Sequence, residues 1–166
     1  MLQVGTQIVY GIHGVCTILD VETRRVDRKN VEYFVLEPRD QPGTRCYVPT
    51  QSQAAISKLR PILSKEELEA LLSSEIIQSD IWISDENKRK MKYKELISNC
   101  DRAALISMIR LLVDHKQKQL ESGKKFHLCD DNFLRDALKL LSSEYSFVFE
   151  IPQNEVSRCL LERICK

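Results

Sequence analysis

The sequence predicts an α+β protein in which a small β-rich unit precedes a compact helical bundle. Glycine and proline give the first indication, because four of the five residues of each kind lie within the first 61 of 166 positions. These residues punctuate short strands and turns and are poorly tolerated inside helices. Beyond position 61, apolar residues recur at helical spacing behind helix-start signals. Strands followed by helices favour two adjoining units, which we place at residues 1–62 and 63–166.

Four segments of the first unit have the composition of strands, being rich in Val, Ile, Thr, Tyr and Phe. They are residues 6–10, 15–22, 31–37 and 44–48. The polar residues 24–30 and 38–43 are interpreted as hairpin connections. Four or five short strands in about 60 residues form a small, strongly bent barrel or sheet, close to the lower size limit for independent stability. We therefore expect this unit to pack on the helices or to dock on a partner.

Helix-start signals recur along the second unit. Ser64 and Glu67 have the spacing of a capping box, in which each side chain satisfies a free backbone N–H group of the other residue. Further start signals, each followed by apolar residues at helical spacing, are Asp85, Asp101, Asp130 or Asp131, and Pro152. Gly123 is expected to end the helix that begins at Asp101. Several amphipathic helices with short links predict a bundle.

Charge and hydropathy exclude several classes of protein. Twenty-five Lys and Arg stand against 24 Asp and Glu, and the net charge of +1 argues against a protein that coats nucleic acid by itself. No run approaches the roughly 18 apolar residues of a membrane span, and the first ten residues lack the features of a signal peptide. We therefore expect a cytoplasmic protein without membrane contact. No long heptad seam demands self-association, so we expect a monomer.

Residues that carry catalysis or bind metals are sparse. The six cysteines form no CxxC pair, which argues against a zinc site. No segment has the pattern of a phosphate-binding loop. The three histidines, His13, His115 and His127, lie far apart in different predicted elements. We predict a protein that is not an enzyme and has no cofactor; a pocket that gathered these histidines beside carboxylates would favour an enzyme instead.

One local feature indicates an interaction. Five cations fall within residues 88–94, six residues after the only tryptophan, Trp82. The cations are Lys88, Arg89, Lys90, Lys92 and Lys94. Such density can neutralise several phosphates, and a nearby aromatic ring can stack on or wedge beside a base. The alternative is a solvated helix face, with Trp82 packed in the core between Ile81 and Ile83.

The N-terminal residues are more specific. Residues 4–18, VGTQIVYGIHGVCTI, resemble the opening of the CarD family, which has Val-Gly-Asp, then Val-Val-Tyr-Pro, then His-Gly-Val-Gly and an Ile. The resemblance continues in the same order through residues 22–24, 33–36, 47–49, 92–101, 109–112 and 137–144. It thus covers nearly the whole chain. Thr6, Gly11 and Cys16 depart from the pattern at turn positions.

The resemblance implies a fold and a function. CarD-like proteins have an N-terminal Tudor/SH3-like β-barrel, shared with the transcription-repair coupling factor, that binds the β subunit of bacterial RNA polymerase. Their helical domain touches promoter DNA at the upstream edge of the melted bubble and stabilises the open complex. The resemblance therefore implies a bacterial transcription regulator. The alternative is a protein–protein adaptor whose Tudor-like unit binds another partner without touching DNA.

The resemblance also implies site residues. Arg24 falls where the family has a polymerase-contacting arginine, and Tyr47 falls at a second, basic position of the family. Arg45 shares a strand face with Tyr47 and is a substitute for that basic residue, so Arg24, Arg45 and Tyr47 are the expected polymerase-binding residues. The expected DNA-binding residues are Trp82, Lys88, Arg89, Lys90, Lys92 and Lys94. The family's wedge tryptophan aligns with Glu86, four residues after Trp82, so Trp82 either reaches DNA or is a core residue.

Overall fold

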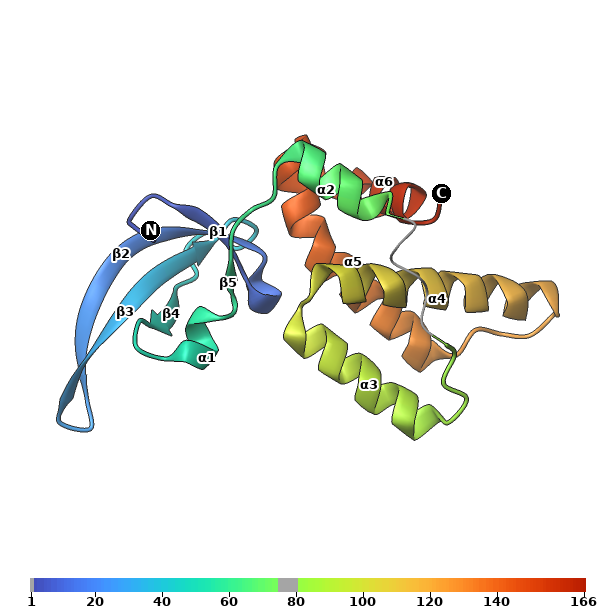
Figure 1. Ribbon diagram of the computed structural model, residues 1–166, viewed down its shortest axis with the longest axis horizontal. Helices are drawn as coiled ribbons and strands as arrows, with labels where there is room; N and C mark the ends of the chain where they lie inside the picture. The colour runs from blue at the N-terminus through green and yellow to red at the C-terminus, as the bar shows by residue number, and fades with distance from the viewer. Residues whose placement is uncertain (1, 75–80) are drawn as a thin grey trace. The chain divides into compact units, whose positions relative to one another are not determined.

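The structure is a computed structural model that describes residues 2–74 and 81–166, and the chain divides into two units, Met1–Ile62 and Leu63–Lys166 (Figure 1). The strands of the described residues all lie in the first unit, and every helix of eight or more residues lies in the second. The α+β class is therefore confirmed.

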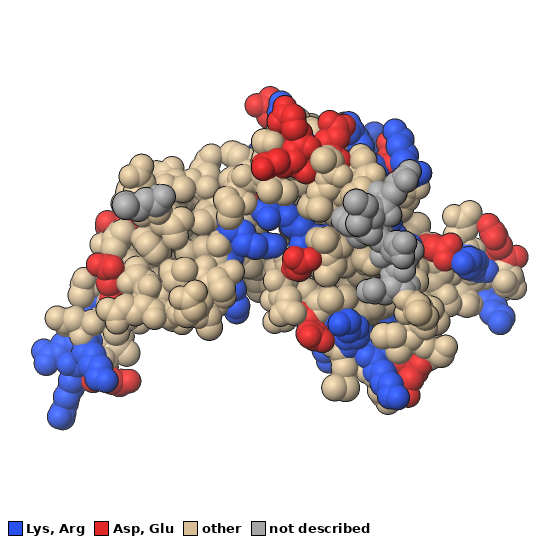
Figure 2. Space-filling view, viewed as in Figure 1, with Lys and Arg blue, Asp and Glu red and all other residues tan. Residues whose placement is uncertain are grey.

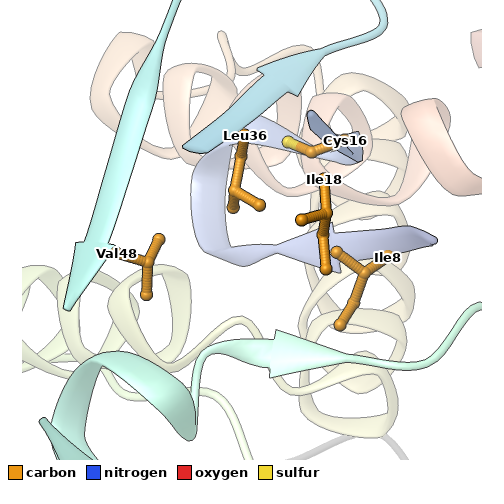
Figure 3. Packing of buried hydrophobic residues seen from close by; sticks show 5 residues of the cluster. All are labelled: Ile8, Cys16, Ile18, Leu36 and Val48. Atoms are coloured by element: carbon orange, nitrogen blue, oxygen red, sulfur yellow. The ribbon is translucent and has the colours of Figure 1, made fainter. Parts of the chain in front are cut away.

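The first unit is built on one antiparallel sheet. Its strands are β1 (Gln7–Tyr10), β2 (Val15–Val26), β3 (Lys29–Pro38), β4 (Cys46–Pro49) and β5 (Leu59–Arg60), in the spatial order β4-β3-β2-β1-β5. Ile8, Cys16, Ile18, Leu36 and Val48 form the core of the unit and point toward one another from β1, β2, β3 and β4 (Figure 3). Alternation along the strands places these residues on one face of the sheet.

The prediction of a β-barrel is corrected to an open sheet. β4 and β5 are the outer strands, and within the described residues no ladder joins them. The short helix α1 (Gln53–Ile56) lies between them in the chain, and its Ala55 and Ile56 pack against the core cluster. A helical turn thus covers apolar surface that strand pairing would cover in a closed barrel.

The prediction that residues 24–30 form a polar connection is also wrong. β2 and β3 pair without interruption from Val21 and Phe34 to Val26 and Lys29, and only Asp27 and Arg28 form the turn. β1 pairs with β2 no further than Thr17, and β4 pairs with β3 no further than Tyr33. The end of the hairpin is therefore a two-stranded ribbon that extends from the sheet as an arm (Figure 1).

The second unit consists of the helices α2 (Lys65–Leu72), α3 (Glu86–Asn99), α4 (Arg102–Glu121), α5 (Leu128–Phe149) and α6 (Gln153–Ile164). The capping box at Ser64 and Glu67 is confirmed, and so are the caps at Asp85 and Asp101, whose carboxylates accept from backbone N–H groups three residues on. Gly123 follows the end of α4 with a φ of 70°, as predicted for a stop.

One helix start differs from the prediction. α5 begins at Leu128, so Asp130 and Asp131 lie in its first turn instead of capping it. Pro152 lies at the N-cap of α6 and opens that helix, as predicted.

Apolar packing between α4, α5 and α6 forms the core of the second unit. Its fully buried side chains include Leu105, Ile106, Ile109, Leu112, Ala137, Tyr145, Leu160 and Ile164. Arg102 and Glu144 form a bidentate ion pair between α4 and α5, with N–O distances of 2.7 and 2.8 Å. Among the described residues, no helix combines the length and apolar character needed to cross a membrane.

Candidate interaction surfaces

The sheet brings two of the predicted polymerase-binding residues into contact. Arg24 on β2 places its guanidinium 3.7 Å from the centroid of the Tyr47 ring on β4. Glu22, two residues earlier on the same strand face, accepts from Arg24 Nε and Nη2 at 3.1 and 3.0 Å. Tyr33 on β3 meets the Tyr47 ring edge-on, at a centroid distance of 6.4 Å. We call Glu22, Arg24, Tyr33 and Tyr47 the aromatic–arginine surface.

The geometry holds an exposed guanidinium in one place. The hydrogen bonds that Arg24 donates to Glu22 raise the pKa of Arg24, and the Tyr47 ring supplies a cation–π contact. A side chain that is already ordered loses less conformational entropy when a partner binds. Exposed Tyr and Arg side chains are also the types that most often dominate protein interfaces.

Arg45 is exposed and lies immediately before β4, outside the strand. Within the described residues Arg45 forms no ion pair or ring contact. It therefore does not take part in the contact between Arg24 and Tyr47. Its guanidinium is free to meet a partner.

The five predicted cations of α3 fall into three groups, which are exposed, paired at the surface, or buried. Lys88, Lys92 and Lys94 are exposed, with only a distant contact of 3.9 Å between Lys92 and Glu95. Lys90 is paired with Glu86 one turn earlier. Met91 lies among the lysines and is 73% exposed, so the outer face of α3 carries an apolar centre between cations.

Arg89 is placed differently from its neighbours. It is 5% exposed, and its Nε and Nη2 donate to the two carboxylate oxygens of Asp130 on α5, at 2.9 and 3.0 Å. Its Nη1 donates to the carbonyl of Ile83 at 2.8 Å. The hydrogen bond with Asp130 raises the pKa of Arg89. Arg89 therefore anchors α3 to α5. Because its guanidinium is buried in this pair, Arg89 is not a DNA-contacting residue in this structure.

Trp82 is neither packed in the core nor fully exposed beside α3. Its ring is half-buried, stacks on His115 of α4 at a centroid distance of 3.5 Å, and has the Arg89 guanidinium 4.5 Å from its centroid. Burial lowers the pKa of His115, which favours the neutral imidazole in this stack. Ile81, which the core alternative placed in the interior beside Trp82, is instead 91% exposed. The exposure of Ile81 could not be predicted from its residue type, because an isoleucine next to a tryptophan is ordinarily assigned to a core.

The described residues offer little for catalysis. A hollow of about 510 Å³ beside β1, α1 and β5 is lined by apolar and uncharged side chains such as Leu2, Ile8 and Leu59. Residues 2–74 and 81–166 contain no group of three His, Cys, Asp or Glu side chains arranged to hold a metal ion. Burial raises the pKa of the Cys16 thiol to about 12, so this cysteine is unreactive.

Comparison with known proteins identifies the first unit. Residues 2–60 match the family described as the CarD-like/TRCF RID domain, a span that includes all five strands of the sheet. Residues 2–60 therefore form a domain of the CarD-like/TRCF RID family, an RNA polymerase-interacting domain. No curated protein matches the chain.

The RID family is a family of protein-interaction domains and not of catalytic ones. Arg24 and Tyr47 both lie within the matched residues, so the aromatic–arginine surface belongs to the RID domain. The match ends before α2, and the helical unit lies outside it.

Proposed function

We propose that this protein is a CarD-like bacterial transcription regulator that binds the β subunit of RNA polymerase and stabilises the open promoter complex. The observation that carries the proposal is the ordered Arg24–Tyr47 pair on the RID domain. In this proposal the protein acts as a monomer in the cytoplasm, where the polymerase works. Residues 1–62 form its polymerase-binding domain, with a Tudor-like fold, and residues 63–166 form its DNA-contacting domain.

The polymerase contact is assigned to Arg24, Arg45 and Tyr47. Glu22 holds Arg24 over the Tyr47 ring, so the guanidinium meets the partner with little loss of freedom. Arg45 supplies a second cation near the same edge strand, two residues before Tyr47. Short antiparallel edge strands such as β4 are also suited to pairing with a strand of the partner.

The DNA contact is assigned to the outer face of α3 and the segment before it. Lys88, Lys92 and Lys94 present their charges to solvent, and Lys90 joins them when a phosphate replaces Glu86 as its partner. The Arg89–Asp130 pair keeps this helix in place. The exposed part of Trp82, next to Ile81, provides apolar contact with a sugar or base.

The protein acts by binding one state of the promoter better than another. A ligand shifts an equilibrium only by its difference in affinity for the two states. A tenfold preference for the melted promoter would favour the open complex by about 1.4 kcal/mol. Weak DNA affinity is sufficient for this, because the polymerase holds the protein beside the promoter.

Footprinting of a melted promoter tests the function. We expect permanganate reactivity of the bubble to rise when the protein is added to polymerase and promoter, and to rise less with Lys88→Ala/Lys92→Ala/Lys94→Ala. Lys65→Ala/Lys139→Ala/Arg158→Ala, which removes three exposed cations from other helices, is the matched control and should act as the wild type does. Equal reactivity with and without the wild-type protein would contradict the proposed stabilisation of the open complex.

The alternative function is that of an adaptor whose RID domain binds another protein and which does not contact DNA. The near-neutral charge of the chain and the half-buried position of Trp82 favour it. Its signature in the same experiment is permanganate reactivity that does not change when the protein is added, even though the protein remains bound to the polymerase.

A further inference from the structure

The arm formed by β2 and β3 ends in a basic tip that the proposed function does not use. Beyond Thr23 and Glu32, residues 24–26 of β2 pair only with residues 29–31 of β3. Arg25, Arg28 and Lys29 are exposed there, with Asp27 as the only acidic residue between positions 23 and 31. Figure 2 shows Lys and Arg side chains gathered at the end of this arm. We call Arg25, Arg28 and Lys29 the hairpin tip.

The three charges of the hairpin tip point in different directions. Arg25 is paired with Asn30 across the ribbon, and Lys29 with Val26, so alternation places Arg25 and Lys29 on opposite faces. Arg28 lies in the turn itself. Within the described residues none of the three forms an ion pair. Arg24, which directly precedes Arg25, is by contrast held by Glu22 and Tyr47. The ribbon is therefore basic on both faces and at its end.

The turn retains a cation where the backbone favours glycine. Asp27 and Arg28 have φ values of 48° and 66°, both in the left-handed region. Two-residue hairpin turns of this kind prefer Asn-Gly or Asp-Gly, because glycine has no side chain to clash in this conformation. Strained residues of this sort cluster at functional sites. The arginine therefore adds a charge at the outermost point of the arm in spite of its conformation.

We propose that the hairpin tip is a binding site for double-stranded DNA, in which the ribbon enters a groove and its cations contact the phosphates on either side. The major groove of DNA is wide enough for a two-stranded β-ribbon. Charges on both faces of a ribbon match a groove, whose two walls both carry phosphates, better than they match a single acidic surface on a protein. This site is separate from the α3 surface and does not depend on it.

Fluorescence anisotropy of the full-length protein with a labelled random-sequence duplex tests the proposal. The affinity is measured between about 20 and 200 mM salt for the wild type and for Arg25→Ala/Arg28→Ala/Lys29→Ala. Each lost phosphate contact lowers the slope of log K against log salt by about 0.9. We therefore expect the slope to fall by roughly 2 to 3, with at least tenfold weaker binding at 0.1 M salt. Lys65→Ala/Lys139→Ala/Arg158→Ala, with the same change in charge, should leave the slope unchanged.

A single substitution separates binding from folding. Arg28→Gly removes one charge and relieves the left-handed arginine, so the melting temperature should stay the same or rise while DNA binding weakens severalfold. A lower melting temperature with unchanged affinity would contradict the role of Arg28. Equal affinity of the wild type for the duplex and for one of its single strands would overturn the groove assignment.

The remaining outcomes distinguish this site from the α3 surface. A slope that falls with Lys88→Ala/Lys92→Ala/Lys94→Ala but not with the hairpin-tip variant overturns this inference and leaves the proposed function standing. A slope that falls only with the hairpin-tip variant supports the inference and contradicts the α3 contact. An equal loss of affinity in the control variant, or no duplex binding by the wild type at 20 mM salt, overturns the inference. Loss of polymerase binding by the hairpin-tip variant with unchanged DNA affinity would assign the tip to the protein partner and also overturns it.

Discussion

Single residues of α3 that look alike in the sequence have different tasks. Lys88 is exposed, whereas Arg89, the next residue, is buried against Asp130. Arg89 shares a helix face with Tyr93, four residues on, which is also buried. That spacing was a signal that Arg89 points inward, but its partner lies 41 residues away in the chain. A contact of this range depends on how the helices pack, which no local pattern contains.

The buried pair makes a stability prediction. Asp130→Ala should lower the free energy of unfolding by about 3–5 kcal/mol, because Arg89 is left as an unpaired buried charge. The double variant Arg89→Met/Asp130→Leu should recover most of that loss, since neither charge remains to be desolvated. Urea unfolding measures both. Lys90→Ala, which breaks the exposed pair with Glu86 on the same helix, serves as the control and should cost less than about 1 kcal/mol.

The Trp82–His115 stack makes a prediction about pH. Burial lowers the pKa of His115 below its usual value of about 6.5, so the unfolded chain binds a proton at this site more readily than the folded chain does. The contribution of the stack to stability is therefore present above about pH 6.5 and is lost as the pH falls below that value.

An NMR titration of the histidine ring protons checks this. His115 should titrate below its usual range in the wild type, and Trp82→Ala should raise its pKa toward that range by exposing the ring. Charged neighbours also act on the pKa of His115: Arg89 and Lys118 lower it, and Asp130 and Asp114 raise it. Trp82→Phe leaves these charges in place and retains an apolar ring over the imidazole, so it is the comparison for Trp82→Ala. A pKa that does not respond to Trp82→Ala would mean that the indole is not what buries the imidazole.

Whole elements were predictable where their signals are local. The caps of α2, α3 and α4 were found from the sequence because a capping side chain and its N–H partner lie within three residues. The length of the β2–β3 hairpin could not be predicted from the sequence. Its polar residues Arg24, Arg25 and Arg28 have the composition of a loop, although they lie on a paired ribbon and its turn. The open edge of the sheet was missed as well, since it depends on α1 packing over the core.

A cap on α4 gives a prediction at the level of an element. The Asp101 carboxylate accepts from the N–H of Ala104 at 2.8 Å, so Asp101→Ala should lower the free energy of unfolding by about 1 kcal/mol. Asp114→Ala removes the same charge from the exposed middle of the same helix, where the Asp114 carboxylate pairs with Lys118. That substitution should cost no more than about 0.5 kcal/mol. Equal effects in thermal or urea unfolding would show that the cap contributes nothing beyond its charge.

At the scale of the whole molecule, the charge is distributed in patches. Residues 1–62 carry eight basic and six acidic side chains, and residues 63–166 carry 17 and 18. Within the described residues, exposed cations nevertheless cluster at two places, the hairpin tip and the outer face of α3. A protein with low net charge and local basic patches is suited to weak DNA contact once a larger partner has brought it to the promoter. In the proposed function, such a protein would depend on its polymerase contact to reach the promoter.

The central claim is that the aromatic–arginine surface binds RNA polymerase, and a pull-down with the lobe of the polymerase β subunit tests it most directly. The wild type should be retained, and Arg24→Glu and Tyr47→Ala should each weaken binding by roughly tenfold or more, as expected of residues at the centre of an interface. Lys58→Glu, which reverses an exposed charge next to β5 on the same domain, should be retained like the wild type. Failure of the wild type to bind would contradict the claim, as would equal binding of Arg24→Glu and the wild type.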